Sequence, residues 1–126
     1  MLFLFGLLAL SCSKPSDQVL IRFQNTLNTE IRDAQYEFDK EHITYVGRLA
    51  RHSKTGYLPF DYFEIGSGVP MGVLKGMDGA NTFSASSAFW CGTGIDFSLL
   101  EPGKYTIVIS EIGTGKRPYY QLKFAD

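Results

Sequence analysis

The sequence has few cysteines and no long hydrophobic run. Only Cys12 and Cys91 are present among its 126 residues, which excludes the disulfide framework typical of small secreted scaffolds. The longest stretch of apolar or small residues is Met1–Leu10. A helix of that length spans about 15 Å, whereas the hydrocarbon core of a bilayer is about 30 Å thick. This stretch is therefore too short for a transmembrane helix.

An excess of charge of either sign is also missing. The chain has 12 basic and 13 acidic residues, a net charge of -1, and no basic stripe. Nucleic-acid-binding domains carry clustered basic residues, so nucleic acid is not expected as a partner. His42 and His52 are each isolated from cysteines and from paired acidic residues at metal-ligand spacing. We therefore predict neither a metal site nor a cofactor.

The N-terminal segment instead has the features of an export signal. Its apolar region has the length of a secretory signal and ends at a small residue, Ser11. The residues Ala9-Leu10-Ser11-Cys12 resemble the lipobox of bacterial lipoproteins, usually Leu-(Ala/Ser)-(Gly/Ala)-Cys. The resemblance implies that Cys12 receives a diacylglyceryl group and that residues 1–11 are removed as a signal peptide, which leaves residues 12–18 as a lipidated tether. An ordinary signal peptide followed by an incidental cysteine is the alternative.

The same resemblance implies a place in the cell. Lipid on Cys12 would attach the protein to a membrane of the cell envelope. Ser13 follows where an Asp would act as an inner-membrane retention signal, so the outer membrane is expected. A lipidated Cys12 leaves Cys91 without a disulfide partner. Because Cys91 follows Phe89 and Trp90, we predict a buried, unreactive thiol.

From residue 19 onward the dominant hydrophobic period is two, which is typical of β-strands. Apolar and polar residues alternate most clearly in 19–24, 32–38, 105–110 and 119–124. The last two segments are joined by a glycine-rich loop and predict a hairpin. Pro59 cannot donate a backbone hydrogen bond, so the aromatic-rich segment around it is expected to be an edge or bulged strand.

A short motif gives a more specific indication of the fold. Leu100-Glu101-Pro102-Gly103-Lys104-Tyr105 resembles the segment before strand F of fibronectin type III and related immunoglobulin-like domains. There the tyrosine hydroxyl bonds to upstream backbone. The same Pro-Gly-Lys-Tyr pattern also introduces strands in transthyretin-like and other sandwiches, so it supports the sandwich class and leaves the topology open. Together with the spacing of the strand-like segments, it predicts that residues 19–126 form an all-β domain, an immunoglobulin-like antiparallel β-sandwich of about seven strands. Taken whole, the chain resembles small lipoproteins of Gram-negative bacteria that pair a lipobox with one such domain.

No arrangement typical of catalysis stands out in the sequence. Glycosidases use paired carboxylates, and the acidic residues that would have to meet in space are scattered along the chain. Solvated surface positions explain these acids equally well. We therefore predict a non-enzymatic protein and keep an envelope hydrolase as the second alternative. The acids concerned are Glu64, Asp78, Asp96 and Glu101.

Aromatic residues are the remaining candidates for binding. The chain has 10 Phe, 7 Tyr and 1 Trp, and most of them must fill the core. Tyr57, Tyr62, Trp90 and Tyr119 fall at loop-like or outward positions, where a ring can stack on a sugar or anchor a protein. Packing of Trp90 inside the core is the alternative for that residue. We predict a lipid-anchored envelope protein acting as a binding or accessory module, with surface glycan binding as the alternative function.

Overall fold

The computed structural model describes residues 18–87, 96–113 and 119–126. All regular secondary structure in these ranges is β-strand, which confirms the prediction of an all-β domain. Cys12, Trp90 and Cys91 lie outside the described residues. The strands are β1 (Val19–Asn25), β2 (Ile31–Asp39), β3 (His42–Leu49), β4 (Ser53–Lys54), β5 (Leu58–Phe60), β6 (Glu64–Gly66), β7 (Val69–Pro70), β8 (Val73–Asp78), β9 (Asn81–Ser86), β10 (Phe97–Leu99), β11 (Gly103–Ile112) and β12 (Tyr119–Phe124).

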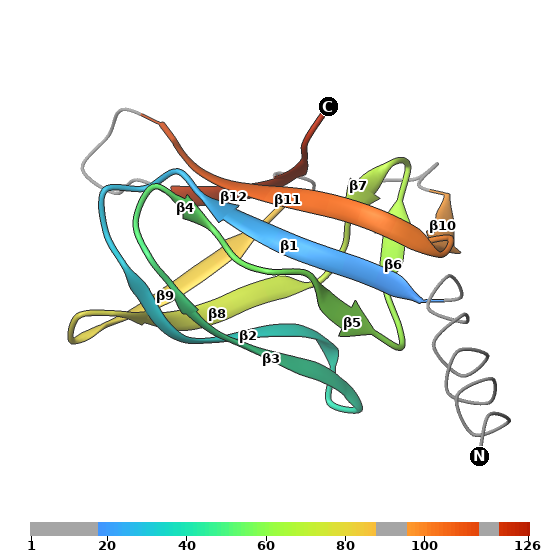
Figure 1. Cartoon of the computed structure of the whole chain (residues 1–126), viewed down its shortest axis with the longest axis horizontal. Helices are drawn as coiled ribbons and strands as arrows, with labels where there is room; N and C mark the ends of the chain where they lie inside the picture. Colours follow the sequence, from blue (N-terminus) through green and yellow to red (C-terminus); the bar gives the residue numbers. More distant parts are fainter. Residues whose placement is uncertain (1–17, 88–95, 114–118) are drawn as a thin grey trace, which may run out of the picture.

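Nine of these strands form one large sheet. Its order is β3-β2-β8-β9-β12-β11-β1-β4, and β5 also pairs with β1. In Figure 1 this sheet bends over on itself, so that β11, β12 and β1 lie above β9, β8, β2 and β3. The remaining strands form a small sheet in the order β10-β6-β7. The large sheet is therefore nearly closed, like a barrel.

The finer prediction of about seven antiparallel strands is wrong. The described residues contain twelve strands, and two neighbouring pairs, β1 with β11 and β12 with β9, run parallel. Proline and glycine divide the middle of the chain into strands of two or three residues, since Pro59 falls in β5 and Pro70 in β7. Parallel pairing joins segments far apart in sequence, and a hydrophobic period of two does not reveal it.

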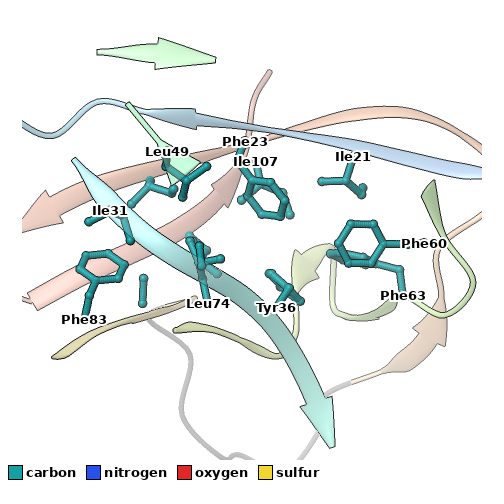
Figure 2. Close-up of a cluster of buried hydrophobic side chains, with 14 of the residues drawn as sticks. Ile21, Phe23, Ile31, Tyr36, Leu49, Phe60, Phe63, Leu74, Phe83 and Ile107 are labelled. Carbon is teal, nitrogen blue, oxygen red and sulfur yellow. The ribbon is translucent and has the colours of Figure 1, made fainter. Parts of the chain in front are cut away.

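The alternating segments predicted from the sequence supply the core. Ile21 and Phe23 of β1 are fully buried, as are Ile107 and Ile109 of β11, which pairs with β1. Figure 2 shows these side chains meeting those of β2, β8 and β9 between the two halves of the sheet. The predicted hairpin is also confirmed, because β11 and β12 pair antiparallel.

The hydroxyl bond expected from the Leu100–Tyr105 motif is present. The Tyr105 hydroxyl donates a hydrogen bond of 2.9 Å to the backbone carbonyl of Glu101. This contact fixes the turn that leads into β11. Because the strand number and pairing differ from a seven-stranded sandwich, it defines a local corner and not the topology of the domain.

Tyr36 of β2 occupies the centre of an aromatic cluster. Its ring centroid lies 5.0 to 5.8 Å from those of four phenylalanines on β1, β2, β5 and the β5–β6 connection. Its hydroxyl donates a hydrogen bond to the Met71 carbonyl. Burial raises the pKa of Tyr36, so the hydroxyl stays protonated and remains a donor. The four phenylalanines are Phe23, Phe38, Phe60 and Phe63.

Replacing this buried hydroxyl tests its contribution to stability. We expect Tyr36→Phe to lower the free energy of unfolding by about 1–3 kcal/mol, because the Met71 carbonyl loses its partner. Tyr45→Phe is the matched control, since Tyr45 is 62% exposed, and should change stability by less than about 0.5 kcal/mol. Urea unfolding followed by circular dichroism measures both. Equal midpoints for the two variants would contradict the role assigned to Tyr36.

Candidate functional site

The large sheet is left open along one seam. Within the described residues, β3 has a single sheet neighbour, β2, and the outer edge of β1 is taken by β4 and β5. A groove of about 360 Å³ separates β3 from β5 and the residues that follow it, and we call it the β3–β5 groove. Its lining residues are Glu41, His42, Ile43, Thr44, Tyr45, Pro59, Asp61 and Tyr62.

The β3 wall of this groove combines a backbone edge with exposed apolar side chains. Successive side chains of a strand point to opposite faces. On β3, Ile43 and Tyr45 share the outer face and are 47% and 62% exposed. His42, Thr44 and Val46 alternate with them and are half-buried. An exposed isoleucine and tyrosine side by side on an edge strand form a ready contact surface.

The opposite wall is held in place by a stacked pair of rings. The Tyr62 ring lies parallel to the His42 ring, with 3.9 Å between centroids and 22° between planes. The other contacts of Tyr62 are an edge-on packing against Phe38 and a 3.0 Å hydrogen bond from its hydroxyl to Glu64 Oε2. Because His42 begins β3 and Tyr62 follows β5, the stack joins the two walls at one end of the groove.

Asp39 holds His42 in the orientation that this stack requires. His42 Nδ1 lies 2.9 Å from Asp39 Oδ1 and 3.0 Å from Oδ2. The same Oδ1 accepts the backbone N–H groups of Glu41 and His42 at 2.8 and 2.9 Å. These bonds, foremost that from the His42 ring, lower the pKa of Asp39. The carboxylate therefore stays ionised and fixes both the β2–β3 turn and the imidazole.

The three predicted aromatic residues that the structure describes do not lie together. Tyr62 lies in the β3–β5 groove. Tyr57 lies elsewhere, with the Arg22 guanidinium carbon 5.0 Å and the Lys104 Nζ 5.3 Å from its ring centroid. Tyr119 is paired with Ile112 at the far end of β11 from Lys104. Eight residues of strand separate these two positions on β11, which is about 26 Å at about 3.3 Å per residue.

The carboxylates considered for a hydrolase do not all lie together, because Glu64, Asp96 and Glu101 are on or beside the paired strands β6 and β10, whereas Asp78 is on β8. Glu64 of β6 accepts the Tyr62 hydroxyl, and Asp78 of β8 accepts the Thr29 hydroxyl at 2.7 Å. Asp96 precedes β10 and Glu101 precedes β11. In the part of the chain that the structure describes, no three His, Cys, Asp or Glu residues are placed to hold a metal ion. These observations give no specific support to the hydrolase alternative.

Two further hollows of about 430 Å³ each flank the loop that follows β1. The Thr26 hydroxyl donates to the Ile109 carbonyl at 2.6 Å, and His52 Nε2 lies 2.7 Å from the Asn28 side-chain oxygen. Among the described residues, no large apolar side chain that lines these hollows is exposed, whereas the β3–β5 groove has the exposed Ile43 and Tyr45. We therefore choose the β3–β5 groove as the candidate site.

Sequence reasoning identified Tyr62 but missed the rest of the groove. His42 was examined only as a metal ligand, and its contact with Asp39, three residues before it across a turn, was not predicted. Ile43 and Tyr45 belong to a short segment with a period of two, which indicates a strand but not whether its edge is free. The contact between His42 and Tyr62 depends on tertiary structure and has no signal in the sequence.

Comparison with known proteins gives a similarity of fold. No family model and no curated protein matches the chain. The structure is similar to the NMR structure of a protein from Eubacterium rectale, with a TM-score of 0.53 and 13% sequence identity. The match covers 89% of this chain and 92% of that chain. At this identity the similarity shows the fold alone. Among the described residues, no helix is long and apolar enough to cross a membrane.

The hydrogen bond between Tyr62 and Glu64 is expected to be visible in a titration. The Glu64 carboxylate accepts a hydrogen bond from the protonated phenol and repels the phenolate, and both effects raise the pKa of Tyr62. We expect Glu64→Gln to lower this pKa toward the ordinary value of about 10. Glu41→Gln, in the same groove but without a bond to Tyr62, should leave it unchanged. An NMR titration of labelled tyrosine measures both, and an unaltered Tyr62 pKa in Glu64→Gln would rule out the bond.

Proposed function

We propose that this chain is a lipid-anchored, non-catalytic binding module of the cell envelope, which holds a partner in the β3–β5 groove. One observation carries the binding role: the open seam of the sheet, where the exposed Ile43 and Tyr45 flank a groove whose two walls are joined at one end by the His42–Tyr62 stack. Proteins bind ligands preferentially in such pre-formed concave sites.

The anchor is supported by the sequence before β1. Cys12 follows an apolar segment that resembles a lipoprotein signal. Seven residues from Cys12 to Val19 span at most about 25 Å when fully extended. Val19 begins β1 and pairs with Phe60 of β5. A lipid on Cys12 would therefore keep the domain close to the membrane, with the β5 wall of the groove nearest to the membrane.

Metabolic labelling with a palmitate analogue tests the anchor. We expect label on the wild-type protein and on Cys91→Ala. Cys12→Ala should lose the label and leave the membrane fraction, because it lacks the residue that would carry the two or more acyl chains needed for stable attachment. Cys91→Ala is the matched control, as it removes the other cysteine of the chain. Label that persists in Cys12→Ala, or never forms, would exclude the lipid anchor. Density fractionation of the labelled envelope tests the outer-membrane placement.

Surface glycan binding is a second candidate, favoured by the surroundings of Tyr57. This ring is 38% exposed, and two cations, Arg22 and Lys104, lie over it. The Arg22 Nε donates a 2.8 Å hydrogen bond to the Thr106 hydroxyl, which orients the guanidinium. One aromatic ring with two neighbouring cations suits a sugar that carries a carboxylate.

Binding of an acidic polysaccharide, polygalacturonate, tests this second candidate. We expect Tyr57→Ala to weaken binding about five- to tenfold, from the loss of an aromatic contact. Tyr119→Ala should bind as the wild type does, since Tyr119 lies at the other end of β11. Affinity electrophoresis compares the two variants. Absence of binding, or equal loss in both variants, would remove glycan recognition at Tyr57.

A further inference from the structure

The free edge of β3 has the properties of an edge with which an additional strand can pair. Edge strands present unpaired backbone N–H and C=O groups, and proteins commonly protect such edges with proline, lysine, bulges or short length. β3 has eight residues and contains no proline or lysine. Its pairing with β2 is regular from Ile43 to Tyr45, with a register shift between His42 and Ile43 on one side and another between Tyr45 and Gly47 on the other. The regular part, with exposed Ile43 and Tyr45, lies along the groove.

The two walls of the groove differ in their ability to pair. β5 has only three residues, and its central residue, Pro59, has no N–H to donate. Pro59 itself lines the groove. A segment that enters the groove therefore finds a regular backbone edge at residues 43–45 of β3 and an interrupted one on β5. This asymmetry favours addition of a strand to β3.

The charge of the groove indicates the partner. Glu41 and Asp61 line it, and no lysine or arginine does so. An incoming strand with basic residues would complement these carboxylates, whereas a second copy of the same acidic edge would not. Apolar side chains of that strand would lie beside Ile43 and Tyr45 as cross-strand neighbours.

We propose that an extended, basic segment of a partner protein adds to β3 as an extra strand in the β3–β5 groove. This rests on the proposed function, because it names the chemistry of the partner that the groove binds. Main-chain hydrogen bonds to β3 supply affinity, and the alternate side chains supply specificity. The segment matches the regular part of β3 and its flanks, so four to six residues, about 13 to 20 Å of strand, are sufficient.

Hydrogen–deuterium exchange on the full lipoprotein in detergent micelles tests the mode of binding. The probe is the peptide acetyl-Lys-Val-Lys-Val-Lys-Val-amide, and the control is the same peptide with its valine nitrogens methylated. We expect the basic probe to protect amides of His42–Leu49 and to bind about tenfold or more tightly than the methylated peptide, which lacks the backbone N–H donors of its valines. A peptide with Glu in place of each Lys should also bind more weakly. Failure of the basic probe to bind, binding without protection of β3, or equal affinity of the methylated peptide would each overturn strand addition.

A crosslinking arm separates failure of this inference from failure of the proposed function. Tyr45 and Tyr119 are both 62% exposed, so a photoreactive p-benzoylphenylalanine at either position samples solvent equally. In intact cells we expect a protein adduct at Tyr45 and none at Tyr119.

An adduct at Tyr45 without protection of β3 in the exchange experiment supports binding in the groove but contradicts strand addition. No adduct at Tyr45, or equal adducts at both positions, would overturn binding in the groove. An adduct with a second copy of this chain, or with a glycan, would overturn the choice of a basic protein partner.

Discussion

The rest of the structure depends on the burial of the Tyr36 side chain. Its ring needs apolar neighbours, and its hydroxyl needs a hydrogen-bond partner. The ring packs against Phe23 of β1, Phe60 of β5 and Phe63 before β6, so it holds together strands from opposite sides of the fold. The hydroxyl bonds to the Met71 carbonyl just after β7. A buried polar group without a partner costs free energy, so the segment that carries Met71 is tied to the core. The small sheet is thereby fixed to the large one.

A second buried polar group closes the other end of the sheet. Asn25, only 1% exposed, donates from Nδ2 to the carbonyls of Thr29 and Leu49 and accepts the Leu27 N–H on Oδ1. These bonds join the end of β1 to the end of β3. The aromatic cluster around Tyr36 holds β5 beside β1 at the opposite end. Between the two ends β3 has no second strand among the described residues, and the β3–β5 groove is the consequence.

The sequence predicts the faces of strands far better than their neighbours. Alternation in β1 and β11 correctly marked Ile21, Phe23 and Ile107 as core, because burial on one face imposes a period of two. It did not indicate that β1 lies parallel to β11, about eighty residues further along the chain. The hydrophobic pattern of a strand is the same whichever strand lies beside it. The groove could not be predicted for the same reason, since a free edge is defined by a missing neighbour.

The distribution of aromatic residues argues for a protein partner over a sugar in the groove. A sugar-binding platform needs rings whose free faces lie side by side. Here one face of Tyr62 is covered by His42, Tyr57 is flanked by cations on another part of the surface, and Tyr119 lies at the far end of β11. Residues 43–45 of β3 by contrast form a regular row of backbone groups with an exposed apolar face. Backbone edges recognise extended polypeptide by hydrogen-bond geometry, which a sugar cannot reproduce. This regular edge is therefore suited to a strand, and the carboxylates of Glu41 and Asp61, which line the groove, would favour positive charge on a strand that is added as we propose.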